Sequence, residues 1–188
     1  GVWVSKKFAD DSVATRAYRS LIARYKSMPE SKPNLLLRID PKAGKWKNDV
    51  ASGIAAGARL WGTSKESDKP IPAYISETGE YISEQLAADG IPENAEDAKR
   101  NRDAVSLGRS QAGSHGRYFD FIFSEASANS SGFYQVGAHE YTHYAQQVLS
   151  NNRTGMVERE FWIDEGCATL IGTGMGAVLS LPQDQRVS

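Results

Sequence analysis

No stretch of this sequence restricts the possible folds as strongly as HEYTH, residues 139–143. Successive side chains on an α-helix advance by about 100°, so His139 and His143 would lie within roughly 40° of each other on one face. The apolar residues around them fall on a broad arc on the other side of the same helix: Ala138, Tyr141, Ala145, Val148 and Leu149. We therefore predict a helix whose apolar side packs into the protein while its histidines face a cleft.

The remainder of the chain mixes helical and extended patterns. Apolar residues at helical spacing predict helices at about 12–26, 47–61, 77–90 and 93–106. Apolar or alternating runs predict strands at 1–8, 34–40, 71–76 and 117–124. The Gly- and Ser-rich segment after residue 106 predicts a flexible loop, and the last third is helical, with a second helix at WIDEGCATL.

These patterns predict an α+β fold, with a small mixed sheet and helices followed by a helical part, rather than a regular βαβ series. We expect a single domain over residues 1–188, with an α+β lobe at about 1–130 and a helical part at about 131–188. The chain opens on Gly1 and closes on QDQRVS, which is typical of a trimmed piece, so we expect the helical part to be truncated.

Composition narrows the classes of function. Lys+Arg number 22 and Asp+Glu 23, giving a net charge of −1, so there is no basic excess that would indicate a nucleic-acid partner. No run of about 18 apolar residues predicts a membrane span, and GVWVSKKFADD lacks the apolar core of a signal peptide. Cys167 is the only cysteine, which excludes an intrachain disulfide and a cysteine-rich metal site.

The spacing of HEYTH is that of a metal-binding helix. Two imidazoles one turn apart can reach the same ion, and Glu140 is offset by about a quarter turn, beside the ion. The alternative is a surface helix with two incidental histidines, although the H-E-x-x-H pattern arises by chance in only roughly one chain of this length in a few hundred. We predict a metal site with Glu140 as its catalytic base.

Catalytic zinc takes three protein ligands and keeps one open position, so a third ligand is needed. A histidine six residues after His143 is excluded, because Leu149 stands there and Gln146 replaces the glycine that such a motif requires. His115 remains, in a predicted loop upstream, as does a carboxylate on the helix of WIDEGCATL, 19 residues after His143. The acidic residues of that helix could equally serve only to cap and charge its start.

WIDEGCATL resembles the second metal-binding segment of the gluzincin branch of zincin metallopeptidases, where a glutamate often stands in a W-x-x-E-G-x-A setting. The corresponding residues here are Trp162, Glu165, Gly166 and Ala168. The resemblance is specific over about 117–172 and only architectural over the first hundred residues.

This resemblance implies a zincin-like fold in which one Zn²⁺ is bound by His139, His143 and Glu165, with Glu140 as general base. It also implies a peptide or protein substrate and a secreted or cell-envelope location.

Cys167 offers a competing ligand set. E-G-C together with H-E-x-x-H is also found in peptide deformylases, where the cysteine binds the metal, but there E-G-C precedes a motif that reads H-E-x-D-H. In this chain the order is reversed and Thr142 replaces the aspartate. On a helix Cys167 would lie about 200° from Glu165, so both cannot face one ion. We therefore interpret Cys167 as a small buried apolar residue.

Other residues carry weaker signals. Asp164 and Thr169 could hydrogen-bond a metal ligand or simply belong to a helix end. His115 and Tyr118 are candidates for stabilising an oxyanion, as is Tyr134, whereas Tyr141 falls on the apolar arc; a lone loop histidine is more often solvated. The GTGMG segment at 172–176 lacks the dinucleotide-binding pattern and predicts close helix packing or a helix end.

The prediction that combines these features is a zinc-dependent peptidase. If strand 117–124 lies at the sheet edge, it could pair with an extended peptide and present Tyr118 and Asp120 to it. Two alternatives are a metal-dependent hydrolase of a non-peptide amide and a binding module that keeps the fold without turnover.

Overall fold

The computed structural model describes residues 13–63, 70–76, 78–91, 93–107, 111–115, 118–124, 133–149 and 158–181. Over these residues the protein is a mixed α+β fold in which helices predominate, as the sequence predicts. The strand expected at 1–8 lies outside the described residues. None of the described helices is both long and apolar enough for a membrane span.

Within the described residues the sheet has four strands, β1 (Leu35–Ile39), β2 (Ile71–Ser76), β3 (Gln111–His115) and β4 (Tyr118–Ser124). Their order is β1-β2-β4-β3, with β1, β2 and β4 parallel and β3 antiparallel to β4. Two expectations are corrected here. Among the described strands, β4 is internal rather than at the edge, and the segment expected to be a flexible loop contains the outermost strand, β3.

The physical reason is backbone pairing. QAGSH has almost no apolar pattern, so its sequence does not predict a strand. It becomes one because the backbone groups on the outer side of β4 need partners, and β3 supplies them from Gln111 opposite Ile122 to His115 opposite Tyr118.

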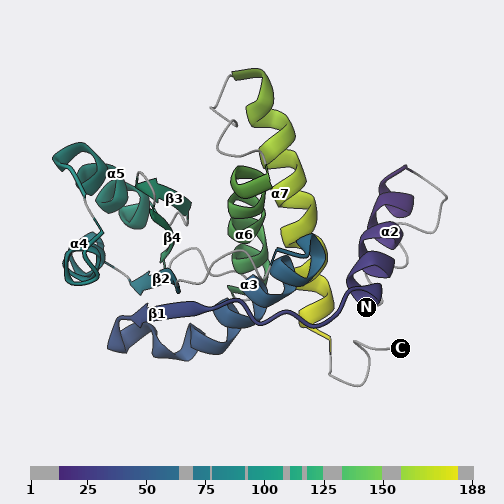
Figure 1. The fold of residues 1–188 in the computed structure, drawn as a ribbon, viewed down its shortest axis with the longest axis horizontal. Helices are drawn as coiled ribbons and strands as arrows, with labels where there is room; N and C mark the ends of the chain where they lie inside the picture. Colours follow the sequence, from purple (N-terminus) through teal and green to yellow (C-terminus); the bar gives the residue numbers. More distant parts are fainter. Residues whose placement is uncertain are drawn as a thin grey trace.

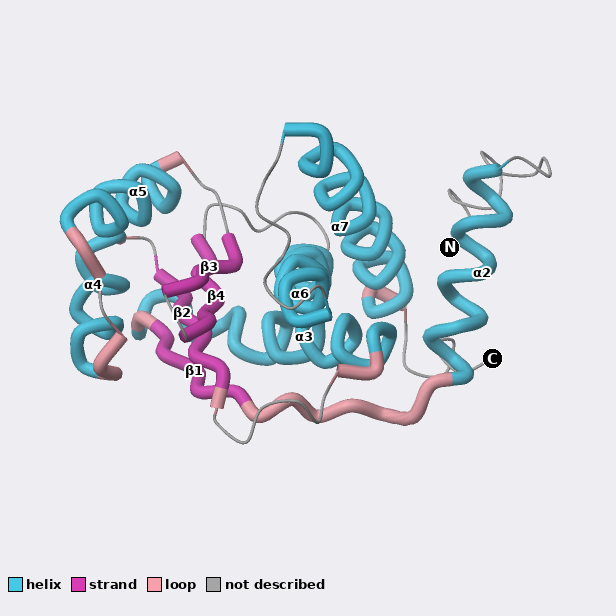
Figure 2. The backbone as a smooth tube through the Cα atoms, turned by 45° about the horizontal axis from the view of Figure 1, so that its top comes forward, coloured by secondary structure: helices cyan, strands magenta, loops and turns pink. Residues whose placement is uncertain are grey.

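Helices cover both faces of this sheet (Figures 1 and 2). On one face lie α4 (Gly79–Ala88) and α5 (Ala95–Ser106), and on the other α3 (Lys47–Trp61) and α6 (Phe133–Leu149). A short 3-10 helix, η1 (Pro41–Trp46), leads into α3. The long α7 (Glu158–Leu179) packs on α6 and α3, and α2 (Val13–Ser27) packs against α7 and α3.

Strand β2 is central to the core because it is buried on both faces. Ala73 and Ile75 belong to the cluster shared with α3 and α6, whereas Tyr74 belongs to the cluster under α4 and α5. This double burial explains why IPAYIS is an almost continuous apolar run rather than an alternating one.

The apolar arc predicted on the HEYTH helix is largely confirmed. Ala138, Tyr141 and Ala145 are fully buried, and Val148 packs against the same core. Leu149 is an exception, with 56% of its surface exposed, because it is the last residue of α6 and lies beyond the buried part of the helix.

Glycines bring the helices around α6 unusually close together. A Cβ on Gly57 of α3 would lie 2.9 Å from Tyr141 Cβ, and one on Gly137 would lie 3.0 Å from the carbonyl oxygen of Val50. On the other side, Gly172 of α7 lies against His139, where an added Cβ would be 2.9 Å from the histidine Cβ. Of the two interpretations of GTGMG, close packing is therefore confirmed and a helix end is wrong, because α7 continues to Leu179.

Candidate metal centre

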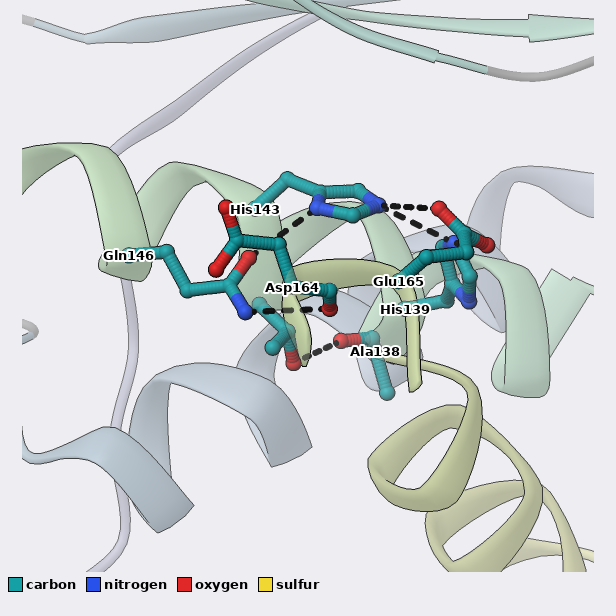
Figure 3. A network of polar contacts seen from close by, with 7 residues as sticks. Ala138, His139, His143, Gln146, Asp164 and Glu165 are labelled. Atoms are coloured by element: carbon teal, nitrogen blue, oxygen red, sulfur yellow. Dashed lines mark hydrogen bonds and ion pairs between the residues drawn. The ribbon is translucent and has the colours of Figure 1, made fainter. Parts of the chain in front are cut away.

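Three predicted ligands converge between α6 and α7 (Figure 3). His139 Nε2 lies 3.2 Å from Glu165 Oε1, and His143 Nε2 lies 3.3 Å from Glu165 Oε2. The two histidine Nε2 atoms are themselves 3.2 Å apart. Among the described residues, this is the group of histidine, cysteine and carboxylate side chains that is close enough to hold a metal ion.

The spacing of these atoms fits tetrahedral coordination. Bonds of about 2.0–2.1 Å to a tetrahedral Zn²⁺ place neighbouring ligand atoms about 3.3 Å apart. The two histidine Nε2 atoms are 3.2 Å apart, His139 Nε2 lies 3.2 Å from one Glu165 carboxylate oxygen, and His143 Nε2 lies 3.3 Å from the other, all close to that value. The three side chains therefore converge closely enough to hold a small divalent ion between them.

Hydrogen bonds fix the orientation of the second histidine. Gln146 Nε2 donates to the backbone carbonyl of Asp164 at 3.0 Å, and Gln146 Oε1 lies 3.0 Å from His143 Nδ1 (Figure 3). We call this pair of contacts the Gln146 bridge. It joins α6 to the turn of α7 immediately before Glu165.

The ligand side chains are shielded but still reachable by solvent. The side chains of His139, His143 and Glu165 are 21%, 27% and 40% exposed. Burial lowers the pKa of His139, the charge of His143 lowers it further, and Glu165 opposes both effects. A depressed pKa favours the neutral imidazole, which is the form that binds metals. Glu140 is only 5% exposed, so its carboxylate is largely withdrawn from bulk water.

Two of the residues between the histidines, Tyr141 and Thr142, anchor the helix. Thr142 is fully buried, donates its hydroxyl to the Ala138 carbonyl at 2.9 Å and accepts from Trp61 Nε1 at 3.3 Å. The hydroxyl of Tyr141 lies 2.8 Å from that of Thr63. These contacts to the end of α3 fix the rotation of α6 about its axis, and thereby the direction in which the histidines point.

The residues with weaker sequence signals have different outcomes in the structure. Asp164 enters the site through its backbone carbonyl, and Thr169 is exposed and takes no part in the contacts between the histidines and Glu165. His115 is the last residue of β3 and does not lie in a loop, and it pairs in register with Tyr118 at the start of β4. The side chains of these two residues lie outside what the structure describes, so their roles stay predictions.

Cys167 is not part of the converging group. It is half-buried, packs against the apolar cluster between α3, α6 and α7, and burial raises the pKa of its thiol. A thiol with a raised pKa is less readily converted to the thiolate that binds metals. This placement agrees with the interpretation of Cys167 as an apolar packing residue.

Sequence reasoning missed the contribution of Gln146. In the sequence this residue serves only to exclude a third histidine ligand six residues after His143, because the motif with that histidine requires a glycine at position 146. The signal that could have identified it is its position three residues after His143, which places an amide beside the imidazole on the same helix face.

Comparison of this chain with protein-family models, with curated proteins and with solved structures finds no match in any of the three.

Proposed function

We propose that this protein is a zinc-dependent peptidase of gluzincin type with a zincin-like fold. The observation that carries the proposal is the convergence of His139, His143 and Glu165 on one point, close enough to hold a metal ion between them. The partial exposure of the three side chains supports a catalytic site with an open position over a closed structural one.

The chemistry divides between the ion and the protein. Zinc, when bound, supplies a Lewis acid that activates water and polarises a carbonyl group. Glu140 accepts a proton from the attacking water and transfers it to the departing nitrogen as the C–N bond breaks. Its burial favours this role, because a carboxylate kept from bulk water exchanges its proton with the reacting groups and not with solvent.

The substrate would bind as an extended chain. Among the described strands, β3 pairs on one side only, with β4, and both strands contact α6, which carries the histidines. A peptide that adds to the outer edge of β3 would gain main-chain hydrogen bonds next to the site. The proposed substrate-binding strand is therefore β3, and not β4 as the sequence suggests, because β4 lies between β2 and β3.

The test is hydrolysis of a peptide library by the purified chain, with and without a chelator. We expect cleavage that stops on chelation and returns when zinc is added back. Cleavage of non-peptide amides but not of peptides would favour the alternative hydrolase, and the absence of any turnover by a zinc-loaded protein would favour a binding module.

A further inference from the structure

Gln146 makes two hydrogen bonds whose directions can be assigned without ambiguity. A backbone carbonyl oxygen can only accept, so the contact with Asp164 must involve the NH₂ group of the Gln146 amide. The amide oxygen is then the atom that faces His143 Nδ1 at 3.0 Å. Because an amide oxygen can only accept as well, Nδ1 must carry the proton.

This assignment determines the state of the other ring nitrogen. A neutral imidazole has one N–H, so a proton on Nδ1 leaves a lone pair on His143 Nε2. His143 Nε2 lies 3.2 Å from His139 Nε2 and 3.3 Å from Glu165 Oε2, which is another acceptor. Two acceptors at this distance repel each other unless a cation lies between them, so the Gln146 bridge prepares His143 Nε2 to bind one.

The bridge also connects the two ligand-bearing helices. Asp164 directly precedes Glu165, and its carbonyl oxygen has a second lone pair available beyond its helical hydrogen bond. A single amide therefore spans from a histidine of α6 to the backbone beside the glutamate of α7. Movement of α7 relative to α6 would disturb both contacts together.

We propose that Gln146 is the positioning residue of the metal site, holding His143 in the Nδ1–H tautomer and keeping it in register with Glu165. This inference rests on the proposed function, because it assigns a residue to the same metal centre. Hydrogen-bonding partners of metal-bound histidines commonly change metal affinity by about 10–100-fold when they are removed.

The first arm of the test needs no metal. Nitrogen-15 NMR of the metal-free full chain at mildly alkaline pH reads the tautomer of each neutral histidine. We expect Nδ1–H for His143 in the wild type and a shift toward Nε2–H in Gln146→Met, which has a similar length but no amide. A wild-type His143 that already carries its proton on Nε2 overturns the proposal.

The second arm measures zinc affinity by competition with a chromogenic chelator. We expect Gln146→Met to weaken zinc binding by about 10–100-fold at unchanged stoichiometry. Gln147→Met, the same change one position further along α6, is the matched control and should keep the wild-type affinity. Gln146→Glu retains an acceptor for His143 but loses the donor to the Asp164 carbonyl, so it should keep the tautomer and recover only part of the affinity.

A residue that only braces two helices gives a different result. Gln146→Met would then lower the melting temperature while the tautomer and the zinc affinity stay the same, which overturns the proposal. Failure of Gln146→Glu to rescue the tautomer overturns it too. A wild-type protein that binds no zinc would instead overturn the proposed function, and the two failures are told apart because the tautomer is read in metal-free protein.

Discussion

Glu140 is buried, whereas the two histidines of the same motif are partly exposed. It directly follows His139 on α6, and its side chain does not belong to the group of atoms that converge on the metal position. A carboxylate in this arrangement is suited to move a proton and is not required to hold the ion.

Replacement of Glu140 by Gln should therefore separate catalysis from binding. The amide keeps the size of the side chain but cannot accept the proton of water, so we expect peptide hydrolysis to fall by about 10²–10⁴-fold. Zinc content, measured by atomic absorption on the same samples, should remain at the wild-type level. Loss of the metal in this variant would show that Glu140 is a ligand and not a base.

At the scale of helices, the close approach of α7 to α6 is what places Glu165 beside the histidines. A Cβ on Gly172 would lie 2.9 Å from both His139 Cβ and the Gln135 carbonyl oxygen, whereas a Cβ on Gly166 would meet nothing within 4 Å. The same substitution thus has opposite consequences at two positions of one helix.

Gly172→Ala should force α7 away from α6. We expect a loss of about 1–3 kcal/mol in the free energy of unfolding, which is typical of overpacking, together with weaker zinc binding because Glu165 moves with α7. Gly166→Ala is the control and should stabilise the protein by about 0.5–1 kcal/mol, since alanine is the better helix former. Urea denaturation and zinc competition measure the two effects, and equal behaviour of the two variants would contradict the packing argument.

An ion pair links β1 to the end of α4. Arg38 Nε lies 3.1 Å from each carboxylate oxygen of Asp89, and Tyr74 donates its hydroxyl to Asp89 Oδ2 at 3.0 Å. The hydrogen bonds from Arg38 hold the pKa of Asp89 below its ordinary value, and that from Tyr74 adds to the effect.

The pH dependence follows from this lowered pKa. A carboxyl group with a lower pKa in the folded than in the unfolded protein stabilises the fold above its unfolded pKa of about 3.9 and loses that contribution as pH falls through the folded value. Asp89→Asn should therefore cost about 1 kcal/mol at neutral pH, a modest figure because Arg38 is 37% exposed. Urea denaturation should show the difference from wild type shrinking below about pH 4, and a constant difference at all pH values would refute the linkage.

Local patterns predict most elements of this fold, and the exceptions have a common cause. The helices at 47–61 and 93–106 and the strand at 71–76 were predictable because each carries its own apolar periodicity or run. Strand β3 was not, because only its pairing with β4 makes QAGSH extended. The continuation of α7 through its glycines was not predictable either, because contacts with α6 and α2 compensate for the low helix propensity of glycine.

The residues of the candidate site divide in the same way, into those that local sequence indicates and those that depend on tertiary contacts. His139, His143 and Glu140 could be identified from local spacing, and Glu165 from the resemblance of its surroundings to one family. For Gln146 the sequence could indicate only the contact with His143, three residues earlier on the same helix; its contact with the Asp164 carbonyl, 18 residues further along the chain, depends on the packing of two helices.

For the molecule as a whole, a bound ion would add a link between α6 and α7, two helices that pack on each other and on α3. Such an ion binds only to the folded chain, so zinc at about 100 times its dissociation constant should add about 2.7 kcal/mol to stability. We expect the melting temperature to rise with zinc in the wild type and not in His139→Ala. A rise of equal size in both proteins, measured by calorimetry, would show that the stabilising ion binds elsewhere.

The central claim is that α7 contributes the third metal ligand through Glu165, and calorimetric titration of the metal-free chain with zinc tests it most directly. The wild type should bind one ion, Glu165→Gln should bind it far more weakly, and Cys167→Ser, a change two positions further along the same helix, should bind it as the wild type does. If Cys167→Ser abolishes binding while Glu165→Gln leaves it intact, the ligand set is the cysteine-containing one and Glu165 is not the third ligand.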